Sequence, residues 1–188
     1  MTRNWRDLSY LQNGTSKQKT AKQAIEQSAI MQRLKEFDPV LAGTIPLGID
    51  IADSDLDIIC ESYDLDRFAA TVRASYAAYE GYKEARLLVQ DVPTCLISFF
   101  ACGFWFELFA QPRPVTMQNA YRHMVVEHRL LLLGGPDVLR DIRQLKQNGL
   151  KTEPAFASYF HIPGDDPYQA LLDLEKWTDE QLRALVRR

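Results

Sequence analysis

The segment that most constrains the fold is residues 43–60, in which a glycine turn is followed by two aspartates that open an apolar run. Asp55 and Asp57 alternate with Leu56 and Ile58. Because side chains of an extended strand point to opposite faces in turn, this spacing puts both carboxylates on one face and the apolar side chains in a core. Two carboxylates this close raise each other's pKa, and a divalent cation relieves their repulsion. The segment therefore predicts a buried strand with a metal site at its start.

Transfer of a nucleotide to an acceptor is a chemistry that needs such a pair. The triphosphate must be held and its charge neutralised, which two divalent ions roughly 3.5–4 Å apart achieve. A third carboxylate from a neighbouring strand and a turn whose N–H groups reach phosphate oxygens complete the requirement. Glu107 is our candidate for the third carboxylate, because an unpaired charge in the aromatic run 104–109 would be costly to bury. An exposed position on an edge strand is the alternative for Glu107, and Gly43-Thr44 is the candidate turn.

The periodicity of apolar residues predicts an α+β fold. We expect strands at 40–42, 55–60, 85–90, 94–100 and 104–110, the last three as an antiparallel meander. We expect helices at 16–36, 65–79, 117–133 and 137–147, and shorter helical segments after residue 152. The sheet is expected to be mixed or antiparallel and flanked by helices. Residues 1–114 would form the core domain, with a helical C-terminal region of residues 115–188 packed on it.

Composition narrows the classes of function. Of the 188 residues, 46% are hydrophobic, which is typical of a globular protein with a core. The net charge of −3, without a long basic run, gives no strong signal for a nucleic-acid partner. No apolar run approaches the roughly 20 residues that span a bilayer, so no membrane partner is expected. The three cysteines lack the spacing of a metal site, and reduced thiols are typical of the cytoplasm, where we place the protein.

The pattern Gly43-Thr44-x3-Gly48-x5-Ser54-Asp55-Leu56-Asp57 resembles the signature of the nucleotidyltransferase superfamily, which includes relatives of DNA polymerase β and the minimal nucleotidyltransferases. Most of the chain also resembles a bacterial family of unassigned function with this fold, notably in residues 118–123 and 149–157. The resemblance implies a Mg²⁺-dependent enzyme, with two ions, that moves a nucleoside monophosphate from a nucleoside triphosphate to a hydroxyl of an unknown small molecule or protein. It implies binding of the triphosphate by Gly43, Thr44 and Ser54, and binding of metal by Asp55, Asp57 and Glu107. Glu107 would also activate the acceptor hydroxyl.

The chain departs from this pattern in its cationic residues. Ile45 and Leu47 stand where minimal nucleotidyltransferases often have arginine, so positive charge for the phosphates must come from elsewhere. Arg113 lies between two prolines just after the strand that carries Glu107, and Arg122 and Arg129 share a helix face. We interpret these three as phosphate contacts; for the last two, a solvated face with ion pairs along the helix is the alternative. Further candidates are Lys17, Lys19 and Lys151.

Spacing argues against two other metal sites. The aspartates of residues 53–64 mimic an EF-hand calcium loop, but Ile58 stands where that loop needs glycine. His123 and His128 are five residues apart, about 140° around a helix, and cannot share a metal.

Two other classes of function stay open beside the enzyme. One is a non-catalytic module of the same fold that binds a nucleotide. The other is a protein-interaction module whose helical half docks a partner, as an antitoxin would.

Overall fold

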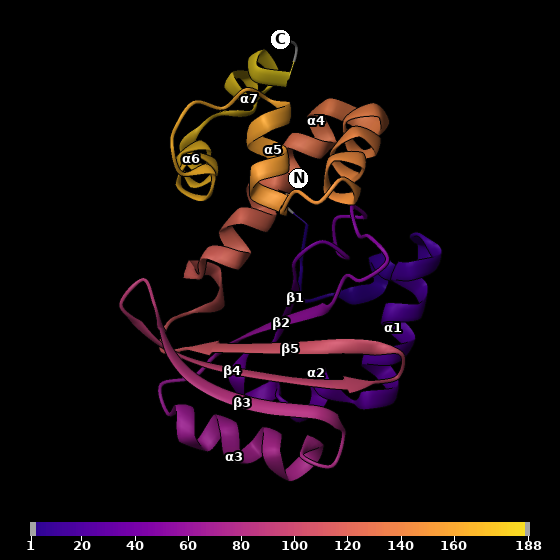
Figure 1. Ribbon diagram of the computed structural model, residues 1–188, viewed down its shortest axis with the longest axis vertical. Helices are drawn as coiled ribbons and strands as arrows, with labels where there is room; N and C mark the ends of the chain where they lie inside the picture. The colour runs from indigo at the N-terminus through magenta and orange to yellow at the C-terminus, as the bar shows by residue number, and fades with distance from the viewer. Residues whose placement is uncertain (1–2, 187–188) are drawn as a thin grey trace.

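The computed structural model describes residues 3–186, and its centre is a five-stranded mixed sheet with helices on both faces (Figure 1). The strands are β1 (Val40–Ala42), β2 (Leu56–Glu61), β3 (Glu80–Val89), β4 (Val92–Ala101) and β5 (Phe104–Gln111). Their order is β1-β2-β5-β4-β3, and β2 runs parallel to β5 while the other neighbours are antiparallel. The predicted α+β class with a helix-flanked mixed sheet is confirmed. This order places the strand of Asp57 beside the strand of Glu107.

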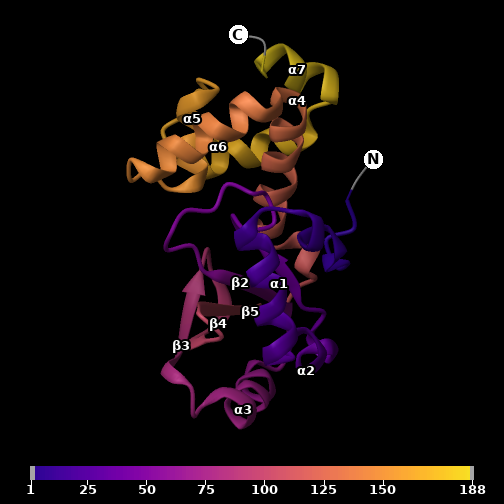
Figure 2. The same ribbon diagram turned by 90° about the vertical axis from the view of Figure 1, so that its right-hand side faces the viewer.

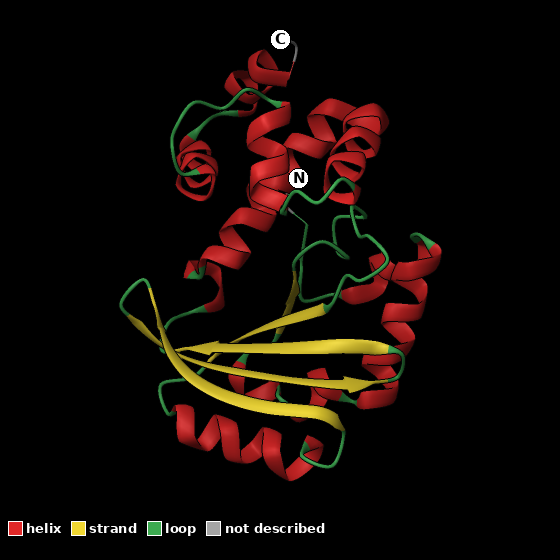
Figure 3. Ribbon diagram, in the orientation of Figure 1, coloured by secondary structure: helices red, strands yellow, loops and turns green. Residues whose placement is uncertain are grey.

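The helices fall into two groups (Figure 3). Those of the first group are α1 (Ser16–Ser28), α2 (Ile30–Arg33) and α3 (Leu65–Tyr76). Those of the second are α4 (Asn119–Gln147), α5 (Thr152–Tyr159), α6 (Pro167–Asp173) and α7 (Asp179–Val186). The second group gathers at one end of the molecule, and α3 lies at the opposite end (Figure 2). No described helix is long and apolar enough to cross a membrane.

Several boundaries differ from the prediction. The helix expected at 65–79 ends at Tyr76, and the strand expected at 85–90 begins at Glu80. The expected helix 16–36 is broken at Ala29, whose φ of 53° is left-handed, and the Tyr76 hydroxyl donates to the Ser28 carbonyl at the break. The expected helices 117–133 and 137–147 instead form one bent helix, α4, which changes direction at Gly135 (φ 75°) before Pro136. The bend follows from a proline that has no N–H and a glycine that tolerates positive φ.

Alternation along the strands builds two hydrophobic clusters on opposite faces of the sheet. The first joins the sheet to α1 and α3 and includes a stack of Phe99 on Phe106, with ring centroids 5.2 Å apart. The second joins the other face to α4–α7 and includes Ile59, Met124 and Phe156. This second cluster contains side chains from both sides of residue 114. The division into domains 1–114 and 115–188 stays a prediction, and residues 1–2 and 187–188 lie outside the described part.

Candidate active site

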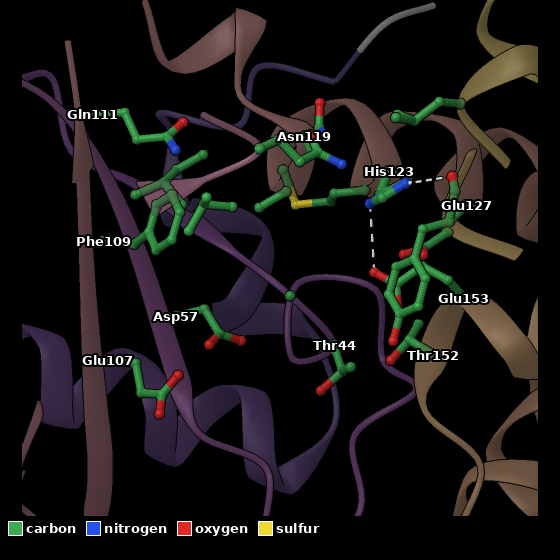
Figure 4. A pocket seen from close by; sticks show the side chains of 18 of the residues that line it. Thr44, Asp57, Glu107, Phe109, Gln111, Asn119, His123, Glu127, Thr152 and Glu153 are labelled. Atoms are coloured by element: carbon green, nitrogen blue, oxygen red, sulfur yellow. Dashed lines mark hydrogen bonds and ion pairs between the residues drawn. The ribbon is translucent and has the colours of Figure 1, made fainter. Parts of the chain in front are cut away.

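A cavity of about 430 Å³ lies between the sheet and the second group of helices (Figure 4). At its sheet side lie Gly43, Thr44, Asp57 and Glu107, and at its helix side lie His123, Glu127, Thr152 and Glu153. Its apolar lining includes Ile59, Leu96, Phe109, Met124 and Leu172. The four residues at the sheet side of the cavity are therefore all residues that the sequence pattern had selected.

Asp57 and Glu107 face each other because β2 and β5 are parallel neighbours in register at these residues. Their strand neighbours Leu56 and Phe106 are fully buried on the opposite face of the sheet. Burial and the charges of Glu107 and Asp55 raise the pKa of Asp57 to about 7. Burial and the charge of Asp55 also raise the pKa of Glu107. Asp57 and Glu107, with the charge of Asp55 nearby, thus make this part of the cavity negative, where a cation would be stabilised.

Asp55 lies just before β2 and is not among the cavity-lining residues. Burial raises its pKa, and the nearby ammonium of Lys17 lowers it. The Lys17 ammonium also donates to the carbonyls of Ile51 and Ala52, at 3.1 and 2.6 Å, and so holds the loop before β2.

The carboxylates of Asp55, Asp57 and Glu107 fit Mg²⁺, which takes oxygen ligands and is usually bound by one or two carboxylates together with water and phosphate oxygens. As the side chains stand in residues 3–186, no three His, Cys, Asp or Glu side chains are grouped to hold one ion. The assignment of these three as metal ligands therefore stays a prediction, supported by their mutual electrostatic effects.

The turn after β1 leaves room for these carboxylates only because it is glycine. Gly43 has a φ of +76°, and a Cβ there would stand 2.0 Å from Oδ2 of Asp57. Next to it, the Thr44 hydroxyl donates to the Ser54 hydroxyl at 3.1 Å, and the Ser54 oxygen accepts the backbone N–H of Ile51. Gly43, Thr44 and Ser54 are therefore brought together beside Asp57, as the sequence pattern suggested.

The three candidate arginines are placed differently. Arg113 lines the cavity. Arg122 forms an ion pair with Glu175 at 2.6 Å, and Arg129 forms one with Asp179 at 2.8 Å. These pairs fasten α4 to the C-terminal segments, and neither arginine lines the cavity. Their contact with phosphates stays a prediction that requires the ion pairs to open.

The helix side of the cavity carries residues that sequence reasoning did not select. His123 is 6% exposed, with Nε2 at 2.9 Å from the Tyr168 carbonyl and Nδ1 at 3.4 Å from Oε1 of Glu153. Glu127, one helical turn further along α4, is 3% exposed. The buried Lys146 donates to the Thr152 hydroxyl at 2.7 Å.

The sequence did contain a signal for these residues at the helix side of the cavity. His123 ends the stretch 118–123, and Thr152 and Glu153 belong to the stretch 149–157, the two stretches that carry the second family resemblance. Nothing in their spacing predicts that α4 and α5 meet at one wall of the cavity.

A family model described as "Domain of unknown function (DUF4269)" matches residues 23–174, which include both sides of the cavity. No curated protein matches the chain. A bacterial origin stays a prediction.

Solved structures show what the fold resembles. The Cid1 poly(U) polymerase with MgGTP bound aligns with a TM-score of 0.53 and 13% identity, over 87% of this chain and 53% of that one. A Cid1 structure described by its RNA terminal uridylyl transferase activity aligns with a TM-score of 0.52 and 14% identity, over 87% and 52% of the two chains. The GLD-2/RNP-8 complex aligns with a TM-score of 0.53 and 12% identity, over 95% and 81%.

The chain spans about half the length of these Cid1 structures. At such low identity the similarity concerns the fold. These neighbours give no support to the expected lack of a nucleic-acid partner, since Cid1 is described as acting on RNA.

Proposed function

The chain belongs to the DUF4269 family, and we propose that it is a Mg²⁺-dependent nucleotidyltransferase that moves a nucleoside monophosphate from a nucleoside triphosphate to an acceptor hydroxyl. The bond between the α- and β-phosphates would break, and pyrophosphate would leave. The observation that carries this proposal is the facing pair Asp57–Glu107 beside Gly43, at one side of a cavity. Similarity to the fold of Cid1, a poly(U) polymerase, supports it.

Each residue has an assigned task. Asp55, Asp57 and Glu107 would hold Mg²⁺, two ions in all, which would neutralise charge on the triphosphate and on the attacking oxygen. Glu107 would also be the base that accepts the proton of the acceptor hydroxyl. Phosphate oxygens would be bound at Gly43, Thr44 and Ser54, and by Arg113, with Arg122 and Arg129 as further contacts after their ion pairs open.

The acceptor hydroxyl would belong to a small molecule, a protein or an RNA end. The described activity of Cid1 adds RNA to the acceptors that must be tested. We place the reaction in the cytoplasm, with residues 1–114 as the catalytic core and residues 115–188 closing the cavity.

We expect the protein to transfer label from at least one α-labelled nucleoside triphosphate to a component of a cell extract in the presence of Mg²⁺. The double variant Asp55→Asn/Asp57→Asn is expected to lose at least about 100-fold of this activity, because both charges that would bind the metal are removed. Extracts treated with ribonuclease or protease identify the class of acceptor.

Asp53→Asn is the matched control, since Asp53 is an exposed carboxylate on the same loop and does not line the cavity. Equal transfer by the double variant and the wild type would refute the proposal. Nucleotide binding that depends on Asp55 and Asp57, without any transfer, would identify a nucleotide-binding module instead.

A further inference from the structure

The wall of the cavity formed by α4 and α5 carries a buried carboxylate that the proposed transfer reaction does not use. Glu127 lines the cavity and is 3% exposed, and its Oε1 has no hydrogen-bond partner in the described part of the chain. Leaving a buried acceptor unpaired costs about 1–3 kcal/mol. A ligand that donates a hydrogen bond at this position would recover that cost.

The charges around Glu127 indicate which kind of donor fits. Glu153, from α5, is a second carboxylate in the same wall, and it raises the pKa of Glu127 further than burial alone does. Lys146 is the nearby cation, but its ammonium donates to Thr152. His123 Nδ1 lies 3.4 Å from Oε1 of Glu153, and no ion pair to Glu127 is formed within residues 3–186. Negative charge at this wall is therefore incompletely matched by the protein.

The lining of the whole cavity also carries more acidic than basic side chains. Its acidic side chains are Asp57, Glu107, Glu127 and Glu153, whereas Arg113 is the one lysine or arginine among the described lining residues. A phosphate without a bound cation would be repelled from the helix side of the cavity. A neutral nucleobase would leave Glu127 and Glu153 without a counter-charge. A cation would be attracted to it and could also donate the missing hydrogen bond.

We propose that Glu127 and Glu153 bind the ammonium group of the acceptor, which is therefore an amine-bearing hydroxylated compound. The identification of this ligand as the acceptor rests on the proposed function. Asp57 and Glu107 lie at one side of the cavity, and Glu127 and Glu153 lie at the other (Figure 4). An acceptor anchored by its amine at the helix side would point a hydroxyl toward Glu107, with its carbon skeleton against Phe109 and Met124.

The test measures amine binding without nucleotide or Mg²⁺. Ethanolamine and glucosamine are titrated by calorimetry in an amine-free buffer, beside their neutral counterparts: ethylene glycol for the first, and glucose and N-acetylglucosamine for the second. At least one amine is expected to bind at least about tenfold more tightly than the neutral compounds. Glu127→Gln and Glu153→Gln are each expected to weaken that binding by about tenfold, because they remove the counter-charge.

Glu180→Gln is the control variant, since Glu180 is exposed on α7 and does not line the cavity. Glutamine has nearly the same shape as glutamate, and Glu153→Gln provides the same comparison if the first variant does not fold. The inference is overturned if no amine binds better than the neutral compounds, or if both variants bind the amines as the wild type does. It is also overturned if Glu127→Gln alters affinity for one nucleoside triphosphate alone, because the wall would then contact a nucleobase. Failure of nucleotidyl transfer appears separately, in the labelling assay.

Discussion

Replacing Asp57 by asparagine is expected to stabilise the native state by about 2–4 kcal/mol above pH 7 when divalent cations are absent. Burial, together with the charges of Glu107 and Asp55, raises the pKa of this carboxyl from 3.8 to about 7. Each unit of that shift corresponds to about 1.4 kcal/mol of preference for the protonated form. Asparagine has nearly the same shape and does not ionise, so the variant avoids the cost of a partly buried charge beside two others.

The direction of the pH dependence follows from the two pKa values. Below about pH 4, Asp57 is protonated in both the folded and the unfolded chain, and the variant gains nothing. Between about pH 4 and 7, the folded chain keeps a proton that the unfolded chain has lost, so wild-type stability falls relative to the variant as pH rises. Above pH 7 the carboxyl is ionised in both states and the full difference is present. Urea unfolding at pH 5 and pH 8 in the presence of a chelator measures it, with less than half of the difference expected at pH 5.

Mg²⁺ should reduce this advantage of the variant. A cation at Asp57 and Glu107 neutralises the charge that destabilises the wild type, so added Mg²⁺ should raise the melting temperature of the wild type more than that of Asp57→Asn. Asp53→Asn, which removes an exposed charge two residues before Asp55, should respond as the wild type does. An equal response of wild type and Asp57→Asn would exclude Asp57 as a ligand.

The sheet side of the cavity was predictable only in part from short-range rules. Alternation in 55–60 and 104–110 predicts which side chains share a face, and a lone glutamate in an aromatic strand needs a neighbour that stabilises it. The observed register, with Asp57 opposite Glu107, joins two residues that are 50 positions apart, and the family pattern, rather than periodicity, suggested that pairing.

The helix side was not predictable in the same way. Arg122 and Arg129 share a helix face, as expected, but the sequence cannot say that Glu175 and Asp179 return to that face. His123 and Glu127 likewise gain their setting from α5 and α6, which pack on α4 through contacts between distant residues. A helical pattern predicts which side chains share a face, and tertiary packing decides what that face contacts.

Replacing Gly43 by alanine is expected to destabilise the protein and to weaken its response to Mg²⁺ and a nucleoside triphosphate. With a φ of +76°, any residue with a side chain pays about 1–2 kcal/mol at this position. The new Cβ would also stand 2.0 Å from Oδ2 of Asp57, so the carboxylate must move away from its place opposite Glu107. Displacement of a packed group adds about 1–3 kcal/mol.

Gly103 offers the matched control, because its φ is +80° and a Cβ there would meet no atom within 4 Å. Gly103→Ala should therefore lose only the backbone contribution and keep the wild-type rise in melting temperature with Mg²⁺ and a nucleoside triphosphate. Gly43→Ala should lose more stability and most of that rise in melting temperature, because the new Cβ would displace the carboxylate of Asp57. If the two variants lose equal stability and both keep the response to ligand, the absence of a side chain at Gly43 does not position Asp57, and the turn acts through its backbone alone.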